Sequence, residues 1–437
     1  GRCGGTVSLA SGATQSGFGR TGTVDWDTAS IKTATFTAVN GNGYFCNTSG
    51  GAFTVNLPAG VAGNIVAVAD YTRTFNTHNL TIAADGSEKI GGVSANDAEL
   101  TVNGQSATFV YVDAAEGWVN INETQTSVTG VPPFVTATGG CVTCCGNFKV
   151  HTFLGPGTFC VTGAGTPAGS TKVDYLVVAG GGGGAVQQSG GGGGGGFRSS
   201  FPSPLCNAGT VTVSATGYPI TVGGGGAATP NAPSIGVTAT PGVNSTFDSI
   251  TSTGGGGGGG YNGTAGAAGG SGGGGAANTG AAGAGNTPAQ SSPAAPVQGY
   301  AGGAGTLYST GGGGGGGGAA AVGGAGPPGA GAGGAGSQNN IDFNNYYWSG
   351  GGGGGNHGSG NAGNGGIGGG GGGGAQANTG GTGGGTAIND GTGGASGAPS
   401  TGGSGGDNSG GGGGGSGCVV TAGNGGSGVV IIRYKFQ

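Results

Sequence analysis

Runs of consecutive glycine constrain this chain more than any other feature of its sequence. Nine runs of four or more glycines occur, among them residues 180–184, 190–196, 254–260, 311–318, 350–355, 368–374 and 410–415. Ordering one glycine costs roughly 1–2 kcal/mol of backbone entropy, and no side chain offsets that cost by burial. Such a tract is therefore either a disordered linker or a structure in which bare backbones pack against one another.

The ordered alternative is a bundle of extended glycine helices of the polyproline II type, with three residues per turn. Their N–H groups point to neighbours in three directions, and only glycine permits such close approach. Several features favour order: the runs have similar lengths, and distinct segments such as residues 210–213, 245–250 and 341–348 separate them. Two apolar segments, 173–179 and 429–436, flank the tract, and we expect them to pair as β-strands and close the domain. No strict Gly-X-Y period is present, which excludes collagen.

Composition divides the chain. Of 437 residues 127 are glycine, and the length allows two to four domains. Between residues 179 and 428 the only charged side chains are Arg198, Asp248, Asp342, Asp390 and Asp407. A net charge of -5 without a basic cluster argues against nucleic acid and anionic membranes as partners. No apolar stretch is long enough for membrane insertion. Because methionine and a signal peptide are absent, we expect a processed product or a fragment.

The even number of cysteines favours disulfides in an oxidising, extracellular setting. Pairs of Cys3 with Cys46 and of Cys206 with Cys418 are the simplest by position, although spacing does not fix the connectivity. Cys144 and Cys145 could instead bridge chains of an oligomer, and a zinc site is disfavoured because no second CxxC follows. The candidate disulfide residues are Cys3, Cys46, Cys141, Cys144, Cys145, Cys160, Cys206 and Cys418.

The predicted fold is an all-β N-terminal module followed by a bundle of packed polyglycine II helices bracketed by β-strands, with essentially no α-helix. Residues 1–30 form a leader or attachment segment. Eight short β runs at about ten-residue spacing predict a sandwich-like module over residues 31–127. Residues 128–147 form a linker with the cysteine cluster, and residues 148–437 form the glycine-rich domain. It opens with a predicted hairpin of residues 149–153 and 158–161.

Two parts of the chain resemble known families. The order Gly43-Tyr-Phe-Cys46, Phe53-Thr-Val-Asn-Leu-Pro58, residues 65–71 and residues 111–118 resembles a β module of bacteriophage tail fibres. The order His151-Thr-Phe153, residues 173–182 and residues 428–434 resembles the glycine-rich domain of phage fibre and adhesin proteins. The resemblance implies a structural protein of the virion tail, extracellular and trimeric. Its partners would be other tail proteins and a host cell-surface glycan or outer-membrane protein.

A rigid scaffold usually carries its binding surface on loops. The best candidate here is the segment 337–349, whose aromatic rings and amides suit the apolar face and hydroxyl rim of a sugar. The alternative is that residues 346–348 pack against the edge of the bundle of glycine segments, which is called the slab below, and close it. Asn389 and Asp390 are weaker candidates. The candidate receptor-binding residues are Asn340, Asp342, Phe343, Asn344, Asn345, Tyr346, Tyr347, Trp348, Asn356 and His357.

Catalysis has little support in the sequence. A glycosidase needs two carboxylates close together, whereas the aspartates of the glycine domain are isolated in sequence. The histidines have no nucleophile at a recognisable spacing, and no phosphate-loop GK[ST] occurs. We expect neither enzyme activity nor a cofactor.

Two other functions remain as alternatives. An ice-binding protein would need regular ranks of Thr or Ala at every third residue, which the irregular inserts do not show. An extracellular bacterial filament or matrix subunit would polymerise alone.

Overall fold

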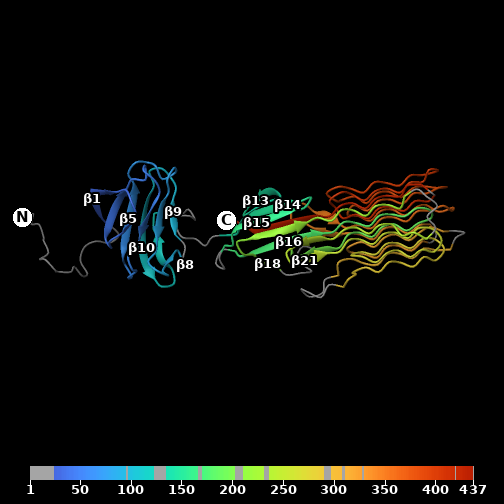
Figure 1. Ribbon diagram of the computed structural model, residues 1–437, viewed down its shortest axis with the longest axis horizontal. Coiled ribbons are helices and arrows are strands. Elements are labelled where there is room, and N and C mark those ends of the chain that lie inside the picture. The colour runs from blue at the N-terminus through green and yellow to red at the C-terminus, as the bar shows by residue number, and fades with distance from the viewer. Residues whose placement is uncertain are drawn as a thin grey trace, which may run out of the picture. The chain divides into compact units, whose positions relative to one another are not determined.

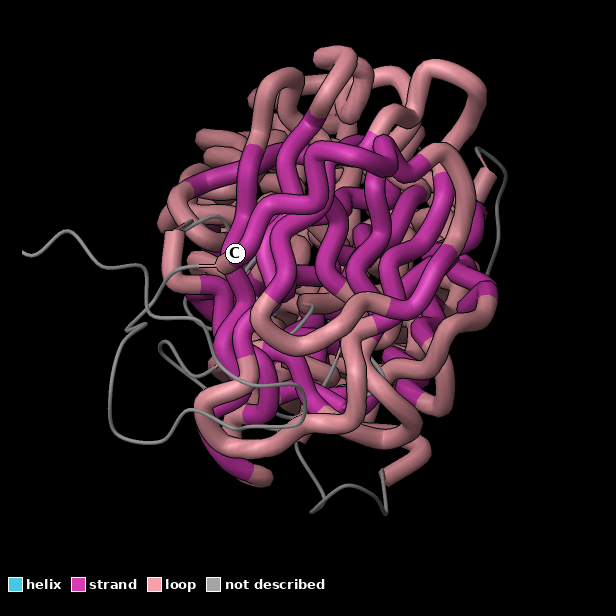
Figure 2. Tube along the Cα trace, turned by 90° about the vertical axis from the view of Figure 1, so that its left-hand side faces the viewer, coloured by secondary structure: helices cyan, strands magenta, loops and turns pink. Residues whose placement is uncertain are grey.

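The computed structural model describes residues 24–94, 97–122, 134–165, 170–201, 210–230, 236–289, 297–307, 311–326, 329–418 and 420–436. These residues form β-strands and extended segments without any helix, as Figure 2 shows, so the predicted all-β class is confirmed. The chain divides into two compact units, and the second begins at Phe134. Figure 1 labels the strands of both units.

The first unit is built from two sheets whose strands alternate along the chain. One sheet has the order β1 (Asp25–Lys32), β3 (Asn42–Cys46), β5 (Ile65–Asp70), β10 (Ser106–Asp113), β11 (Gly117–Asn120), β7 (Lys89–Ile90) and β8 (Val93–Ser94). The other has the order β2 (Phe36–Thr37), β4 (Phe53–Asn56), β6 (Leu80–Ala83) and β9 (Ala98–Leu100). From β1 to β6 successive strands switch sheets, and strands of one sheet pair in parallel.

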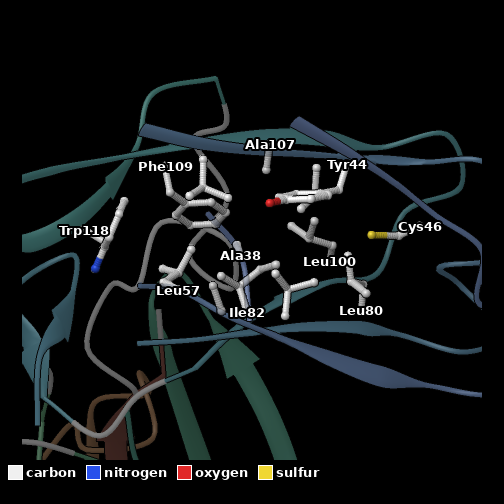
Figure 3. Close-up of a cluster of buried hydrophobic side chains, with 14 of the residues drawn as sticks. Ala38, Tyr44, Cys46, Leu57, Leu80, Ile82, Leu100, Ala107, Phe109 and Trp118 are labelled. Carbon is white, nitrogen blue, oxygen red and sulfur yellow. The ribbon is translucent and has the colours of Figure 1, made fainter. Parts of the chain in front are cut away.

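The core of this unit follows from the alternation of side chains along each strand. In β4 and β6, for example, Phe53, Val55, Leu80 and Ile82 are buried, and the residues between them are only partly covered. Figure 3 shows the rings of Tyr44, Phe109 and Trp118 and the surrounding aliphatic side chains in one apolar cluster.

The end of the predicted leader is part of this unit. Residues 25–30, assigned to the leader, belong to β1, which pairs in parallel with β3. Lys32 Nζ and Asp27 Oδ2 form an ion pair at 3.2 Å within that strand. Residues 1–23 lie outside the described part of the chain.

The second unit begins with two further sheets. One contains β13 (Cys141–Cys145), β14 (Phe148–Phe153), β24 (Val429–Lys435), β16 (Lys172–Val178) and β17 (Phe197–Ser199), with β18 (Val211–Thr212) beside β16. The other contains β12 (Thr136–Thr138), β15 (Gly157–Gly163), β19 (Gly217–Thr221), β20 (Ser245–Phe247) and β21 (Ile250–Ser252). β16 and β24 pair antiparallel, from Asp174 opposite Arg433 to Val178 opposite Val429, which confirms the predicted pairing of the two flanking segments.

Two boundary predictions are wrong. The predicted linker 128–147 contains β12 and β13, because both strands complete sheets of the second unit. The predicted hairpin of residues 149–153 and 158–161 does not form: β14 pairs with β13 and β24, while β15 pairs with β12 and β19. The distant partners β24 and β19, which no local pattern reveals, complete the two sheets on β14 and β15.

The glycine runs bond to one another with a period of three residues. In residues 180–185, successive N–H groups donate to three different neighbouring segments in turn, and the fourth N–H group returns to the first segment. Gly180 and Gly183 donate to residues 240–243. Gly181 and Gly184 donate to residues 423–426, and Gly182 and Ala185 donate to residues 190–193. Three residues per turn is the repeat of the polyproline II helix.

The carbonyl groups of the same segment follow the same rule. They accept from residues 226–229, 255–258 and 413–416, so residues 180–185 have six bonded neighbours. A Cβ built on Gly182 would overlap the carbonyl oxygen of Gly256, and one on Gly192 would overlap that of Gly182. Peptide groups therefore fill the interior that side chains would occupy elsewhere, and only glycine fits.

Outer segments differ from inner ones in sequence. The glycines of residues 180–184, 190–196, 254–260, 311–318, 350–355, 368–374 and 410–415 are all buried. Segments around them carry a side chain at every third position, where it points outward. The exposed ranks include Val237/Thr240/Val243, Ala265/Ala268, Ala281/Ala284, Asn361/Asn364/Ile367, Thr379/Thr382 and Thr421/Asn424.

These ranks correct the sequence analysis, which found no regular Thr or Ala at every third residue. The ranks escaped notice because each is only two or three positions long, and turns of varying length interrupt them. Their chemistry divides the slab: Ala and Val prevail over residues 237–335, and Asn, Thr and Ser over residues 361–427. In Figure 1 the yellow to orange segments and the red segments lie along opposite sides.

Candidate functional site

The predicted receptor-binding segment 337–349 folds back onto the sheet instead of standing free. Its ends form the hairpin β22 (Ser337–Asn339) and β23 (Tyr346–Trp348). Trp348 is completely buried, in an apolar cluster with Val178, Phe197 and Ile341. The amide of Asn339 donates from Nδ2 to Ser199 Oγ at 3.0 Å and anchors the hairpin to β17.

The turn of this hairpin covers a buried cation. Three rings surround the guanidinium of Arg433, with centroid distances of 4.1 Å for Phe148, 4.6 Å for Phe201 and 4.5 Å for Phe343. Burial lowers the pKa of Arg433, and the nearby Asp174 carboxylate opposes that shift. Phe343 thus contacts Arg433 and is still 41% exposed.

The remaining candidates of the segment differ in what they present. Asn344 and Asn345 are exposed, whereas Tyr346 and Tyr347 are half-buried. Burial raises the pKa of Asp342, against the hydrogen bonds that its carboxylate accepts from Asn344 at 3.1 and 3.3 Å. The side-chain oxygen of Asn340 is buried and has no hydrogen-bond partner among the described residues. The surface that the segment offers to a partner is thus confined to the turn at residues 343–345.

Asn356 and His357 do not join this surface. The run 350–355 lies between Trp348 and Asn356, and its six residues at about 3.1 Å each span roughly 19 Å, so Asn356 and His357 lie at the far end of this extended segment. Asn356 is buried and shapes its turn, accepting from Gly358 N at 2.6 Å and donating to the Asn361 carbonyl at 3.2 Å. His357 is exposed.

No disulfide joins the cysteines of the described residues. The six in the described ranges are all free: Cys46, Cys141, Cys144, Cys145, Cys160 and Cys418. Cys46 lies in the core of the first unit, where burial raises its pKa to about 12. Cys141, Cys144 and Cys145 are spread along the exposed edge strand β13. Cys3 and Cys206, the predicted partners of Cys46 and Cys418, lie outside the described residues.

The described residues hold no cluster of three or more His, Cys, Asp or Glu side chains suited to a metal ion. A groove on the polar side of the slab brings together Asn389, Asp390, Thr392, Ser404, Asp407 and Asn424. Sequence reasoning named only Asn389 and Asp390 among these. The sequence did contain a signal for this groove, because Asp390 and Asp407 are two of only four aspartates between residues 179 and 428.

Comparison with known proteins identifies the glycine tract. The model of a family described as a glycine-rich domain matches residues 156–406. No curated protein sequence matches the chain. Over the described residues, no helix is long and apolar enough to cross a membrane.

Proposed function

The chain belongs to the glycine-rich domain family, and from that premise we propose that it is a phage tail fibre or fibre-tip adhesin that recognises a host cell-surface receptor. The observation that carries the proposal is the separation of scaffold from surface in the slab. Inner segments satisfy their N–H groups with backbone carbonyls of neighbouring segments, so side chains at turns and outward positions can change without cost to the interior. That division suits a protein whose recognition surface must follow a changing receptor.

The order of the two units supports the same proposal. A β module precedes the slab, in the arrangement that its resemblance to tail fibres implies, and it would connect toward other virion tail proteins. The receptor would be a glycan or an outer-membrane protein. Assembly as a homotrimer in the extracellular virion tail follows from the same resemblance.

The structure changes which residues we propose for recognition. Trp348 is buried and Asn356 shapes a turn, so neither presents its side chain to a partner. Phe343, Asn344, Asn345 and His357 remain as exposed candidates.

Adsorption to cells tests the proposal. The purified full chain should bind the surface of one bacterial host and block adsorption of the corresponding phage. The double variant Asn344→Ala/Asn345→Ala should weaken both effects, whereas Thr212→Ala, at an exposed position beside the sheet, should not. Absence of binding to any bacterial surface would overturn the proposal.

One observation favours a second function, ice binding. Outward Ala, Val and Thr side chains on residues 237–335 recur every three residues on adjacent segments, which is the regular small-residue surface that this function needs. A thermal-hysteresis measurement on the purified chain separates the two functions, since an adhesin opens no gap between the freezing and melting points of ice. A filament subunit would instead sediment as a polymer in the absence of other proteins.

A further inference from the structure

The polar groove is an open hollow on the slab to which the proposed function assigns no role. Its volume is about 730 Å³, within the range of about 300–1,000 Å³ typical of small-molecule sites. It lies between outer segments that adjoin one another through hydrogen bonds from Gly405 N to the Asn424 carbonyl and from Gly425 N to the Gly226 carbonyl. The lining is formed by Gly225, Gly226, Ala227, Asn389, Asp390, Thr392, Ser404, Gly405, Gly406, Asp407, Asn408, Asn424 and Gly425.

Two carboxylates meet in this groove although the domain around it is almost uncharged. Asp390 follows the turn at residues 386–389 and Asp407 begins the turn at residues 407–410, with a third turn at residues 397–399 between them along the chain. Both aspartates are exposed, and no Lys or Arg lines the groove. Asp390 Oδ1 accepts from Ala387 N at 3.1 Å, while the Asp407 carboxylate bonds to no other group among the described residues. Both side chains therefore keep acceptor oxygens for a ligand.

The walls of the groove are held in place by the scaffold. Asn389 donates from Nδ2 to the Asp407 carbonyl at 2.7 Å and ties the two turns together. Thr392 Oγ1 accepts from Ser404 N at 2.7 Å, and Asn424 Oδ1 accepts from Ala228 N at 2.9 Å. Rigid acceptors lower the entropy cost of binding a ligand.

The sequence also leaves space beside the groove. A Cβ built on the exposed Gly224 would have nothing within 4 Å, so a side chain fits at this outward position and is absent. The floor is bare glycine backbone at Gly225, Gly405 and Gly425.

We propose that this groove binds a saccharide whose hydroxyl and amino groups donate to Asp390 and Asp407. Hydrogen bonds to ionised carboxylates are about twice as strong as those between neutral groups. An ammonium substituent adds charge attraction, and a uronate is repelled by the same carboxylates. The inference deepens the proposed function, on which it rests, by naming a ligand class and a site distinct from the hairpin turn.

Titration calorimetry on the full chain tests the groove. The probes are oligomers of glucosamine, of glucose and of galacturonate. We expect the affinity to fall in that order, with no binding of the galacturonate oligomer. Ala227→Trp fills the groove from an exposed position and should lower the affinity for the glucosamine oligomer at least tenfold. Ala281→Trp, at an equivalent outward position on the apolar side, should leave it unchanged.

A second pair of variants tests the carboxylates without a change of size. Asp390→Asn combined with Asp407→Asn should lower the affinity for glucosamine oligomers at least tenfold, and Asp248→Asn, an exposed carboxylate in the β20–β21 turn, should not. No binding of any oligomer, tight binding of galacturonate, or full affinity in Ala227→Trp would each overturn the proposal. Host adsorption is a separate measurement, so a chain that adsorbs to cells but binds no saccharide here refutes the groove and leaves the proposed function intact.

Discussion

His151 Nε2 lies 3.0 Å from the phenolic oxygen of Tyr434, across the paired strands β14 and β24. His151 Nδ1 is 2.7 Å from the Gly139 carbonyl, which can only accept, so Nδ1 carries the proton and Nε2 accepts from Tyr434. Burial raises the pKa of Tyr434, and a backbone hydrogen bond at Ala137 opposes that rise. Burial also disfavours the charged imidazole, so neutral His151 links β14 to Tyr434 of β24 and to Gly139.

This link predicts a loss of stability in mild acid. Burial is the main cause that lowers the pKa of His151 below its usual 6.5, outweighing the Gly139 hydrogen bond that raises it. As pH falls below 6.5 the unfolded chain takes up a proton that the folded chain excludes. The free energy of unfolding then falls by at most about 1.4 kcal/mol per pH unit until the folded pKa is reached.

Urea unfolding of the second unit, read by pulse proteolysis from pH 8 to pH 5, checks this dependence. His151→Gln should be less stable at pH 8 by about 1–3 kcal/mol, because buried partners lose their hydrogen bonds, and should show a flatter pH profile. His357→Gln, at an exposed site, should keep the parent profile. An unchanged slope in His151→Gln would show that another group titrates.

A matched pair of glycine substitutions tests the packed backbone. In Gly182→Ala the new Cβ overlaps the Gly256 carbonyl oxygen and cannot be accommodated without parting two segments. In Gly224→Ala the Cβ meets nothing within 4 Å. We expect Gly182→Ala to destabilise the second unit by about 3 kcal/mol or more, in the range of severe core substitutions. Gly224→Ala should be neutral or stabilising by up to about 1 kcal/mol, since alanine restricts the unfolded chain.

Thermal unfolding of the two variants against the parent decides the matter. Equal melting temperatures for both would mean that the glycine segments do not lie at the separations described, and the account of the slab would be wrong.

The sequence predicts the parts of this molecule that follow from local composition. The two apolar runs 173–179 and 429–436 were predicted to pair with each other as β-strands, and the antiparallel pairing of β16 with β24 confirms this. The glycine runs imply packing of backbone on backbone. Which runs lie inside depends on register among distant segments, so the ranks that include Thr379 and Thr382 become visible only in three dimensions.

The candidate site was harder to predict for the same reason. An aromatic segment in a polar tract has the composition of a binding loop whether or not it is buried. The burial of Trp348 depends on Phe197, far away in sequence. Asp390 and Asp407 are isolated along the chain, and only the antiparallel pairing of their segments, through Thr392 N and the Ser404 carbonyl, brings the turns into one groove.

The asparagines of the outer segments have a testable role in protecting backbone amides. Asn364 Oδ1 accepts from Thr382 N at 3.0 Å, and Asn361 Oδ1 accepts from Thr379 N at 3.4 Å. These N–H groups belong to an outer segment and point away from the slab interior. Asn364→Ala should speed hydrogen exchange at the Thr382 amide at least tenfold and leave Gly381 and Gly384, which donate to inner segments, unchanged. Exchange measured by NMR at single residues distinguishes this from general loosening, in which all three amides would exchange faster.

The segment 337–349 allows burial to be separated from recognition. Trp348→Ala removes a fully buried ring from the cluster on the sheet and should destabilise the second unit by about 3–5 kcal/mol. Asn345→Ala, at an exposed position of the same hairpin, should change stability by no more than about 0.5 kcal/mol. Urea unfolding gives both values, and host adsorption is then measured for the variants that remain folded. A stable Trp348→Ala that no longer adsorbs to cells would contradict the structural role, because it would place the indole in the recognition surface.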